Sequence, residues 1–234
     1  MKIVFTPDWF LNFDVIVEVF SFIVLIAFLF FAIKSYRIDK NRKTFYLGLG
    51  FAAIALAEIV TILTKLVLYY DMSFTREIGQ AGVTYHVLKS VDWFYYLGFF
   101  IHKLFTLGGL YLIYKIPSKK GTIDDLILGG FFVVVAALFS NTMFFVFNVT
   151  AMFLLFLIIQ NYWKVYQKNK SENTKTLILA FAILFVGQLL FIVSFVGAIY
   201  ALAQIFQLVG YVAMLLLIIK ITKYFLFQIH LQQE

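Results

Sequence analysis

The chain has 234 residues, 63% of them hydrophobic and 13% charged, with a formal net charge of +7. Soluble domains are near half apolar and a quarter charged, so this composition excludes an ordinary soluble protein. The absence of cysteine excludes disulfides, thiolate metal sites and cysteine nucleophiles. We expect a single all-α integral membrane domain over residues 1–234.

The N-terminal segment MKIVFTPDWFLNFD lacks the features of a secretory signal, so we expect it to be retained. Seven apolar stretches follow, each close to the ~20 residues with which a helix crosses about 30 Å of hydrocarbon. Very short turns would separate the fourth span from the fifth at Ser140, and the sixth from the seventh between Gly197 and Tyr200. The predicted transmembrane spans are residues 14–34, 44–69, 92–114, 124–140, 142–163, 176–199 and 201–224.

Basic residues predict the orientation of these spans. Fourteen of them fall on one side, namely Lys34, Arg37, Lys40, Arg42, Lys43, Lys115, Lys119, Lys120, Lys164, Lys168, Lys170, Lys175, Lys220 and Lys223. Only Lys2, Arg76 and Lys89 fall on the other. Because short basic loops stay in the cytoplasm, we expect the N-terminus outside and the C-terminus inside the cytoplasmic membrane. The positive charge then indicates topology rather than nucleic-acid binding, and the basic face is a candidate surface for a protein partner.

Two segments outside the spans also carry expectations. The longest outside link is residues 70–91, for which we expect a plain connector. A short interfacial helix from about Glu77 and a lid over the bundle are the alternatives. The final segment, KYFLFQIHLQQE, is expected to continue the seventh helix into the cytoplasm.

Two stretches of the sequence look alike. Residues 34–51 read KSYRIDKNRKTFYLGLGF, and residues 164–181 read KVYQKNKSENTKTLILAF. Both leave a span, place a tyrosine near the membrane (Tyr36 and Tyr166), cross a basic loop and re-enter on Lys-Thr. The two Lys-Thr pairs align if two residues are inserted in the second copy.

This likeness favours an internal repeat. Residues 14–114 and 142–224 would be parallel three-span units, linked by the span 124–140. Parallel repeats related by an axis along the membrane normal occur in some transporters. The alternative is convergent composition, because any two basic loops between apolar helices look alike.

The layout resembles that of seven-helix, N-outside rhodopsin-like and receptor-like membrane proteins. The stretch Y-R-x-x-K-N-R-K-T-F at residues 36–45, which opens a Gly/Ala-rich helix, is similar to prokaryotic seven-helix sensor regions. A microbial rhodopsin carries a mid-span lysine in its seventh helix for the retinal Schiff base. The first lysine of that span here, Lys220, lies near the predicted cytoplasmic end, so we expect no retinal and no other cofactor.

Four polar residues fall at membrane depth, between the midplane and the outer half of their spans. They are Glu58, His102, Gln188 and Gln207. Buried amides often only join helices, and we favour that role for the two glutamines. An ionisable group inside the membrane is a functional candidate by default. For Glu58 and His102 we therefore keep two roles open, a binding site and simple packing between helices.

The charged residues at this depth predict two pairs between helices. A carboxylate in hydrocarbon is costly unless it is paired, so Glu58 should contact His102 or Lys103 on the third span. Glu18 on the first span lies near the depth of Lys65 on the second, and these two should form the other pair. Together with Gln188 and Gln207, these five residues would line a polar pocket that opens to the outside and binds a small ligand, an ion or a proton.

Other chemistry finds no support in the sequence. The three histidines are scattered, and the sequence contains no H-E-x-x-H, G-x-S-x-G or phosphate-loop motif, so we expect neither a metal site nor enzymatic activity. The first hypothesis is a receptor or sensor-like protein with an outward ligand pocket. The second is a small transporter with Glu58 as a proton or cation site, and the third is a structural subunit of a membrane complex.

Overall fold

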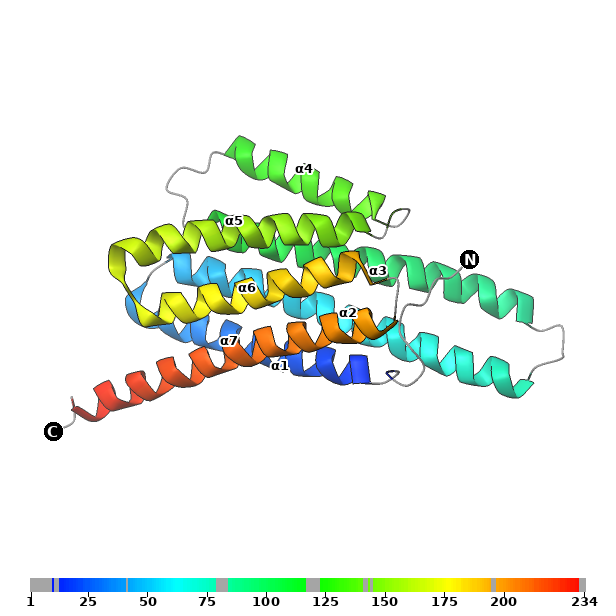
Figure 1. Ribbon diagram of the computed structural model, residues 1–234, viewed down its shortest axis with the longest axis horizontal. Helices are drawn as coiled ribbons and strands as arrows, with labels where there is room; N and C mark the ends of the chain where they lie inside the picture. Colours follow the sequence, from blue (N-terminus) through cyan, green and yellow to red (C-terminus); the bar gives the residue numbers. More distant parts are fainter. Residues whose placement is uncertain are drawn as a thin grey trace.

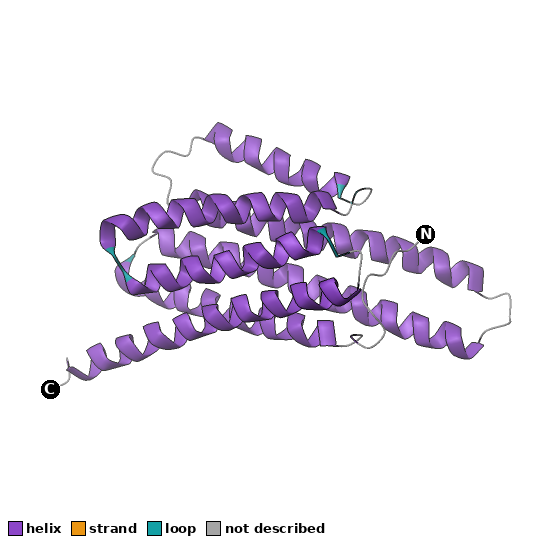
Figure 2. Ribbon diagram, in the orientation of Figure 1, coloured by secondary structure: helices purple, strands orange, loops and turns teal. Residues whose placement is uncertain are grey.

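The computed structural model describes residue 10 and residues 13–40, 42–78, 84–116, 123–140, 143, 145–194 and 197–231. Seven helices account for nearly all of these residues, and Figure 2 shows them joined by short links. The helices are α1 (Phe13–Asp39), α2 (Arg42–Ile78), α3 (Thr84–Lys115), α4 (Ile123–Phe139), α5 (Phe145–Asn169), α6 (Glu172–Ile192) and α7 (Gly197–Leu231).

Six of these helices, all but α4, are long and apolar enough to cross a membrane. The chain is therefore a helical, multi-pass membrane protein, as the composition predicts. The predicted fourth span is also a helix, but α4 has only 17 residues. At about 1.5 Å per residue it is roughly 25 Å long, which is shorter than the hydrocarbon core of about 30 Å.

Two predicted boundaries differ from the structure. The connector expected over residues 70–91 is largely helical, because α2 continues to Ile78 and α3 begins at Thr84. No glycine or proline interrupts α2 between Phe51 and Gly79, so nothing in the sequence ends the helix at the membrane surface. Figure 1 shows α2 and α3 projecting together beyond the other helices.

The turn between α6 and α7 also lies earlier than expected. It contains Val193 and Ser194, whereas Gly197 to Tyr200 already belong to α7. The Val193 and Ser194 amides donate to carbonyls three residues earlier, and the Ser194 hydroxyl donates to the Phe191 carbonyl at 2.8 Å. These bonds tighten the last turn and satisfy carbonyls that a helix end leaves without partners.

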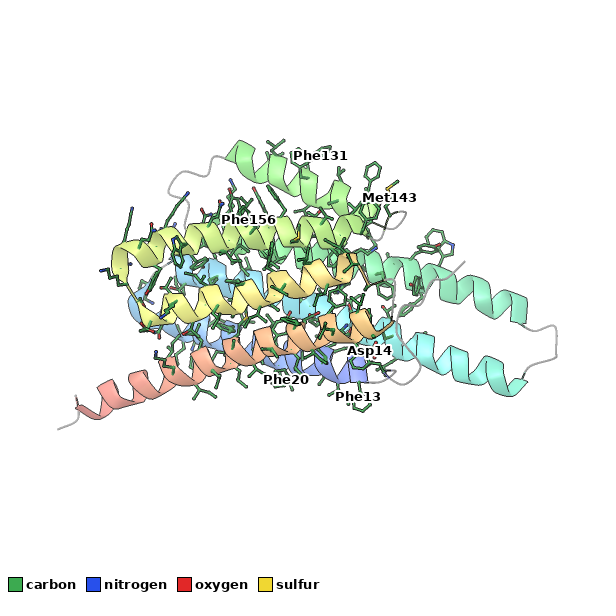
Figure 3. The ribbon with its side chains drawn as sticks, in the orientation of Figure 1. Phe13, Asp14, Phe20, Phe131, Met143 and Phe156 are labelled. Atoms are coloured by element: carbon green, nitrogen blue, oxygen red, sulfur yellow. The ribbon has the colours of Figure 1, made fainter. Side chains whose placement is uncertain are left out.

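Six helices form a closed ring in the order α1, α2, α3, α5, α6, α7, with α7 packed back against α1. Helix α4 lies outside this ring against α3 and α5 (Figure 1). It docks through one stripe, where Gly129 leaves room for the Tyr111 ring and Val133, Ala137 and Ser140 are buried. Its opposite face is exposed, as Phe131 illustrates in Figure 3.

The outer surface of the ring is apolar. On α1, for example, Ile16, Ile23 and Phe30 recur every seven residues and are 62%, 57% and 67% exposed. A continuous apolar surface of this kind suits contact with lipid. The basic side chains that the structure describes, other than Lys65 and Lys103, lie toward the end of the ring where α1, α3 and α5 finish.

Two corners of the ring at this end have the same backbone. Helices α1 and α5 are each followed by a lysine in the left-handed region, Lys40 at φ 51° and Lys170 at φ 47°. The amides of these lysines donate to the carbonyls of Tyr36 and Tyr166, at 2.9 and 2.7 Å. Because both following helices begin two residues later, the described features of the two corners correspond at a constant offset of 130 residues, without the two-residue insertion that aligning the Lys-Thr pairs requires.

Gly109 provides a test of the packing between α2 and α3. A Cβ there would lie 2.6 Å from the Gly50 carbonyl oxygen and 2.6 Å from Ile54 Cγ1, whereas a Cβ on Gly108 would meet nothing within 4 Å. We expect Gly109→Ala to destabilise the protein by about 1–3 kcal/mol through overpacking. Gly108→Ala is the matched control and should leave the thermal unfolding midpoint in detergent unchanged or slightly raised. Equal midpoints for the two variants would show that this close approach is absent.

Candidate functional site

The ring encloses a cavity of about 250 Å³. All six ring helices contribute to its wall, and α4 does not. The seven residues that the sequence singles out all line this one cavity: Glu18, Glu58, Lys65, His102, Lys103, Gln188 and Gln207. Depth along the helix was therefore enough to select residues that share a cavity.

One end of this cavity is apolar. Each ring helix contributes one apolar residue there, and we call this set the floor: Leu25, Phe51, Leu110, Leu155, Phe181 and Met214. All six floor residues are buried, and the packed core continues beyond them toward the basic end through residues such as Ile113, Ile158 and Leu217. The polar lining residues lie on the other side of the floor, toward the end where α1 begins.

Lys65 anchors the polar half of the cavity to α1. Its Nζ donates to Asp14 Oδ2 at 2.8 Å and to Glu18 Oε1, and all three side chains are at least nine-tenths buried. The predicted contact between Glu18 and Lys65 is present. Asp14, in the first turn of α1 (Figure 3), was not predicted as part of the site. Its spacing of four residues from Glu18, which places both carboxylates on one helix face, was the available signal.

Glu58 is buried and bonded to α7. Its Oε1 accepts a hydrogen bond from the Tyr211 hydroxyl at 3.3 Å. Among the described residues Glu58 forms no ion pair, so its predicted partners His102 and Lys103 are not the ones it has. Tyr211, in the middle of α7, was not among the residues that the sequence predicted for the site, because it is neither charged nor an amide.

His102 and Lys103 instead bond to uncharged groups. His102 Nδ1 lies 2.5 Å from Thr61 Oγ1 and 3.3 Å from the Ala57 carbonyl oxygen. Lys103 Nζ donates to the Ser140 carbonyl at 2.8 Å, just beyond the C-terminus of α4. A cation is favoured there because the last carbonyls of a helix lack intrahelical partners and carry partial negative charge.

Several polar atoms in the cavity have no hydrogen-bond partner within the described part of the chain. They are Glu18 Oε2, Thr106 Oγ1, Gln188 Oε1 and Gln204 Oε1. Their side chains all line the cavity. Buried polar atoms in folded proteins are nearly always bonded, so four such atoms around one space indicate an occupant of that space.

The cavity wall also repeats at the 130-residue offset of the helix corners. Six lining positions on α1 and α2 recur on α5 and α6 at this spacing: Glu18 and Asn148, Leu25 and Leu155, Phe51 and Phe181, Ile54 and Leu184, Glu58 and Gln188, and Thr61 and Phe191. Two carboxylates in the first half therefore correspond to two neutral amides in the second.

The described residues contain no group of three or more His, Asp or Glu side chains that could hold a metal ion. Comparison with protein-family models, with curated proteins and with solved structures finds no match for this chain.

Removing the charge of Lys65 tests the ion cluster. We expect Lys65→Met to destabilise the protein by about 3–5 kcal/mol, because it removes the buried cation to which both carboxylates are bonded. Neutralising the partners as well, with Asp14→Asn and Glu18→Gln, should recover much of the loss. Thermal unfolding in detergent measures both effects. If the Lys65→Met protein unfolded at the same temperature as the unmodified protein, the ion cluster would not contribute to stability.

Proposed function

We propose that the chain is a non-enzymatic, receptor-like protein of the cytoplasmic membrane that binds a small polar ligand in the cavity of the six-helix ring. The observation that carries this proposal is the set of four buried atoms, without partners among the described residues, around one cavity. A purely structural bundle would gain nothing from leaving these atoms unbonded, because each costs about 1–3 kcal/mol.

The proposed orientation places the basic end in the cytoplasm and the N-terminus outside. Helix α3 finishes at the basic end and α5 begins at the opposite end, so α4 has to carry the chain back across. We therefore retain seven crossings, with α4 as a short one. In this orientation the polar half of the cavity faces outward and the floor separates the ligand from the cytoplasm.

A small transporter is the second candidate, and the offset of 130 residues favours it. The ring then consists of two parallel three-helix halves, α1–α3 and α5–α7, with the cavity between them. Rocking of two repeats around a central site is a common transport mechanism. In such a cycle the floor would be the closed gate on the cytoplasmic side.

Ligand binding is tested by Glu58→Gln, which removes one charge while keeping the side-chain shape. We expect a ligand, or a change of pH, to raise the thermal midpoint of the unmodified protein and to have little effect on the variant. The screen covers small molecules across a range of pH. Glu172→Gln, an exposed carboxylate in the first turn of α6 at the basic end, is the matched control and should respond like the unmodified protein. Identical responses in all three proteins would exclude Glu58 from a binding site.

Transport is tested by flux into liposomes. For a transporter, a ligand that stabilises the purified protein should also accumulate in liposomes that contain it, and Glu58→Gln should reduce that uptake at least about tenfold. A receptor should show the stabilisation without uptake. Liposomes with the Glu172→Gln protein control for reconstitution.

A further inference from the structure

The unpartnered atoms of the cavity are mostly hydrogen-bond acceptors. Glu18 Oε2 and Gln204 Oε1 belong to residues that are more than nine-tenths buried, and the partly buried Gln188 contributes a third oxygen without a partner among the described residues. The Gln204 amide nitrogen already donates to the Tyr200 hydroxyl at 3.2 Å, which leaves its carbonyl as the free end. A ligand that satisfies these oxygens has to supply N–H or O–H donors.

His102 adds a further acceptor to the same wall. Its Nδ1 lies 2.5 Å from Thr61 Oγ1, whose hydroxyl already donates to the Ala57 carbonyl, and 3.3 Å from that carbonyl. The tautomer that fits both contacts has the hydrogen on Nδ1. In the neutral imidazole, Nε2 is then an acceptor. The ring lies beside Phe147, with centroids 5.6 Å apart, and both residues line the cavity.

The formal charges of the described residues in and beside the cavity also do not balance. With every group ionised, the carboxylates of Asp14, Glu18 and Glu58 and the ammonium groups of Lys65 and Lys103 sum to one negative charge. Lys65 bonds Asp14 and Glu18, which leaves Glu58 with the neutral Tyr211 hydroxyl. A buried charge without a counterion is costly, so a ligand with one positive charge is favoured here.

The rest of the lining favours an organic cation over a metal ion. The rings of Phe99, Phe147, Phe191 and Tyr200 lie among the polar groups, and aromatic faces attract ammonium ions. The cavity of about 250 Å³ far exceeds one water, whose share of liquid volume is about 30 Å³. A bare Na⁺ or Ca²⁺ would need several oxygens to converge on one point.

From these observations we infer that the ligand is a small protonated amine, whose ammonium group bonds the acceptors around Glu58 and Glu18 and whose apolar part lies against the aromatic rings and the floor. This inference rests on the proposed ligand binding. It adds the chemical class of the ligand and holds for either a receptor or a transporter.

The test compares matched ligands on the purified full-length protein. A series of primary ammonium ions from ethylammonium to phenethylammonium is titrated by thermal shift and calorimetry, each beside the alcohol and the carboxylate of the same carbon skeleton. We expect saturable stabilisation by at least one amine and none by its alcohol or carboxylate. Tetramethylammonium, which has charge but no N–H, should bind at least about tenfold more weakly. NaCl and KCl should not compete beyond the effect of ionic strength.

Two variants locate the binding in the cavity. Glu58→Gln should weaken amine binding at least about tenfold, and Glu172→Gln should leave it unchanged. Gln204→Met removes one unpartnered carbonyl and leaves the ion cluster intact. It replaces Glu58→Gln as the test if the Glu58→Gln protein does not fold. We expect it to weaken amine binding several-fold.

The outcomes separate this inference from the proposed function. If an anion, a neutral compound or an inorganic cation binds instead, and Glu58→Gln or Gln204→Met weakens that binding, the amine class is wrong and the cavity remains a ligand site. If no compound of any class binds, both proposals fail. Amine binding that neither cavity variant changes would overturn the assignment to this site.

Discussion

Lys65 reaches from α2 to two carboxylates on α1, and all three side chains are buried between the helices. Charged groups in such a place persist only when they face one another, so the cluster fixes how α1 and α2 are rotated about their axes. That rotation turns the neighbouring positions on α2, Thr61 and Glu58, toward the centre of the ring. The polar half of the cavity follows from this one constraint.

The floor completes the arrangement by a different mechanism. Six helices each contribute one apolar side chain at the same level, and close helix contacts such as Gly50 against Gly109 bring the backbones together around them. Small residues permit this approach where no hydrophobic effect drives helices together in lipid. The cavity is therefore polar toward one end and sealed toward the other, which is the asymmetry that a binding site for a solute from one side requires.

The sequence predicted the elements better than their contacts. Hydropathy located the six long spans because burying a backbone in lipid demands a long apolar helix. Counting residues from the span ends placed Glu58, His102 and Gln188 at one depth, and the cavity contains all three. Depth carries no information on how a helix is rotated about its axis. For this reason the sequence paired Glu58 with His102 or Lys103, whereas Glu58 is bonded to Tyr211 and His102 lies against Thr61.

Other features escaped prediction for physical reasons that differ. Asp14 stands at the first residue of the predicted span 14–34 and was not selected for the site, yet it is buried and bonded to Lys65. The length of α2 was underestimated because a polar helix beyond the membrane has no hydropathy signal. The loop after α5 was aligned to the loop after α1 with a two-residue insertion, because that alignment matches the identical Lys-Thr pairs. The left-handed backbone at Lys40 and Lys170, which gives the alignment without an insertion, is visible only in the structure.

Helix α4 has a further consequence, which concerns the origin of the chain. A three-helix unit crosses the membrane an odd number of times, so a tandem duplicate joined directly to it would insert upside down. In the proposed arrangement of seven crossings, α4, which takes no part in the closed ring, is the additional crossing that restores the second copy to the orientation of the first. Both units keep a basic corner after their first helix, so each carries its own insertion signal. The proposed repeat implies an ancestral dimer of separate three-helix chains, with α4 as the segment that later joined them.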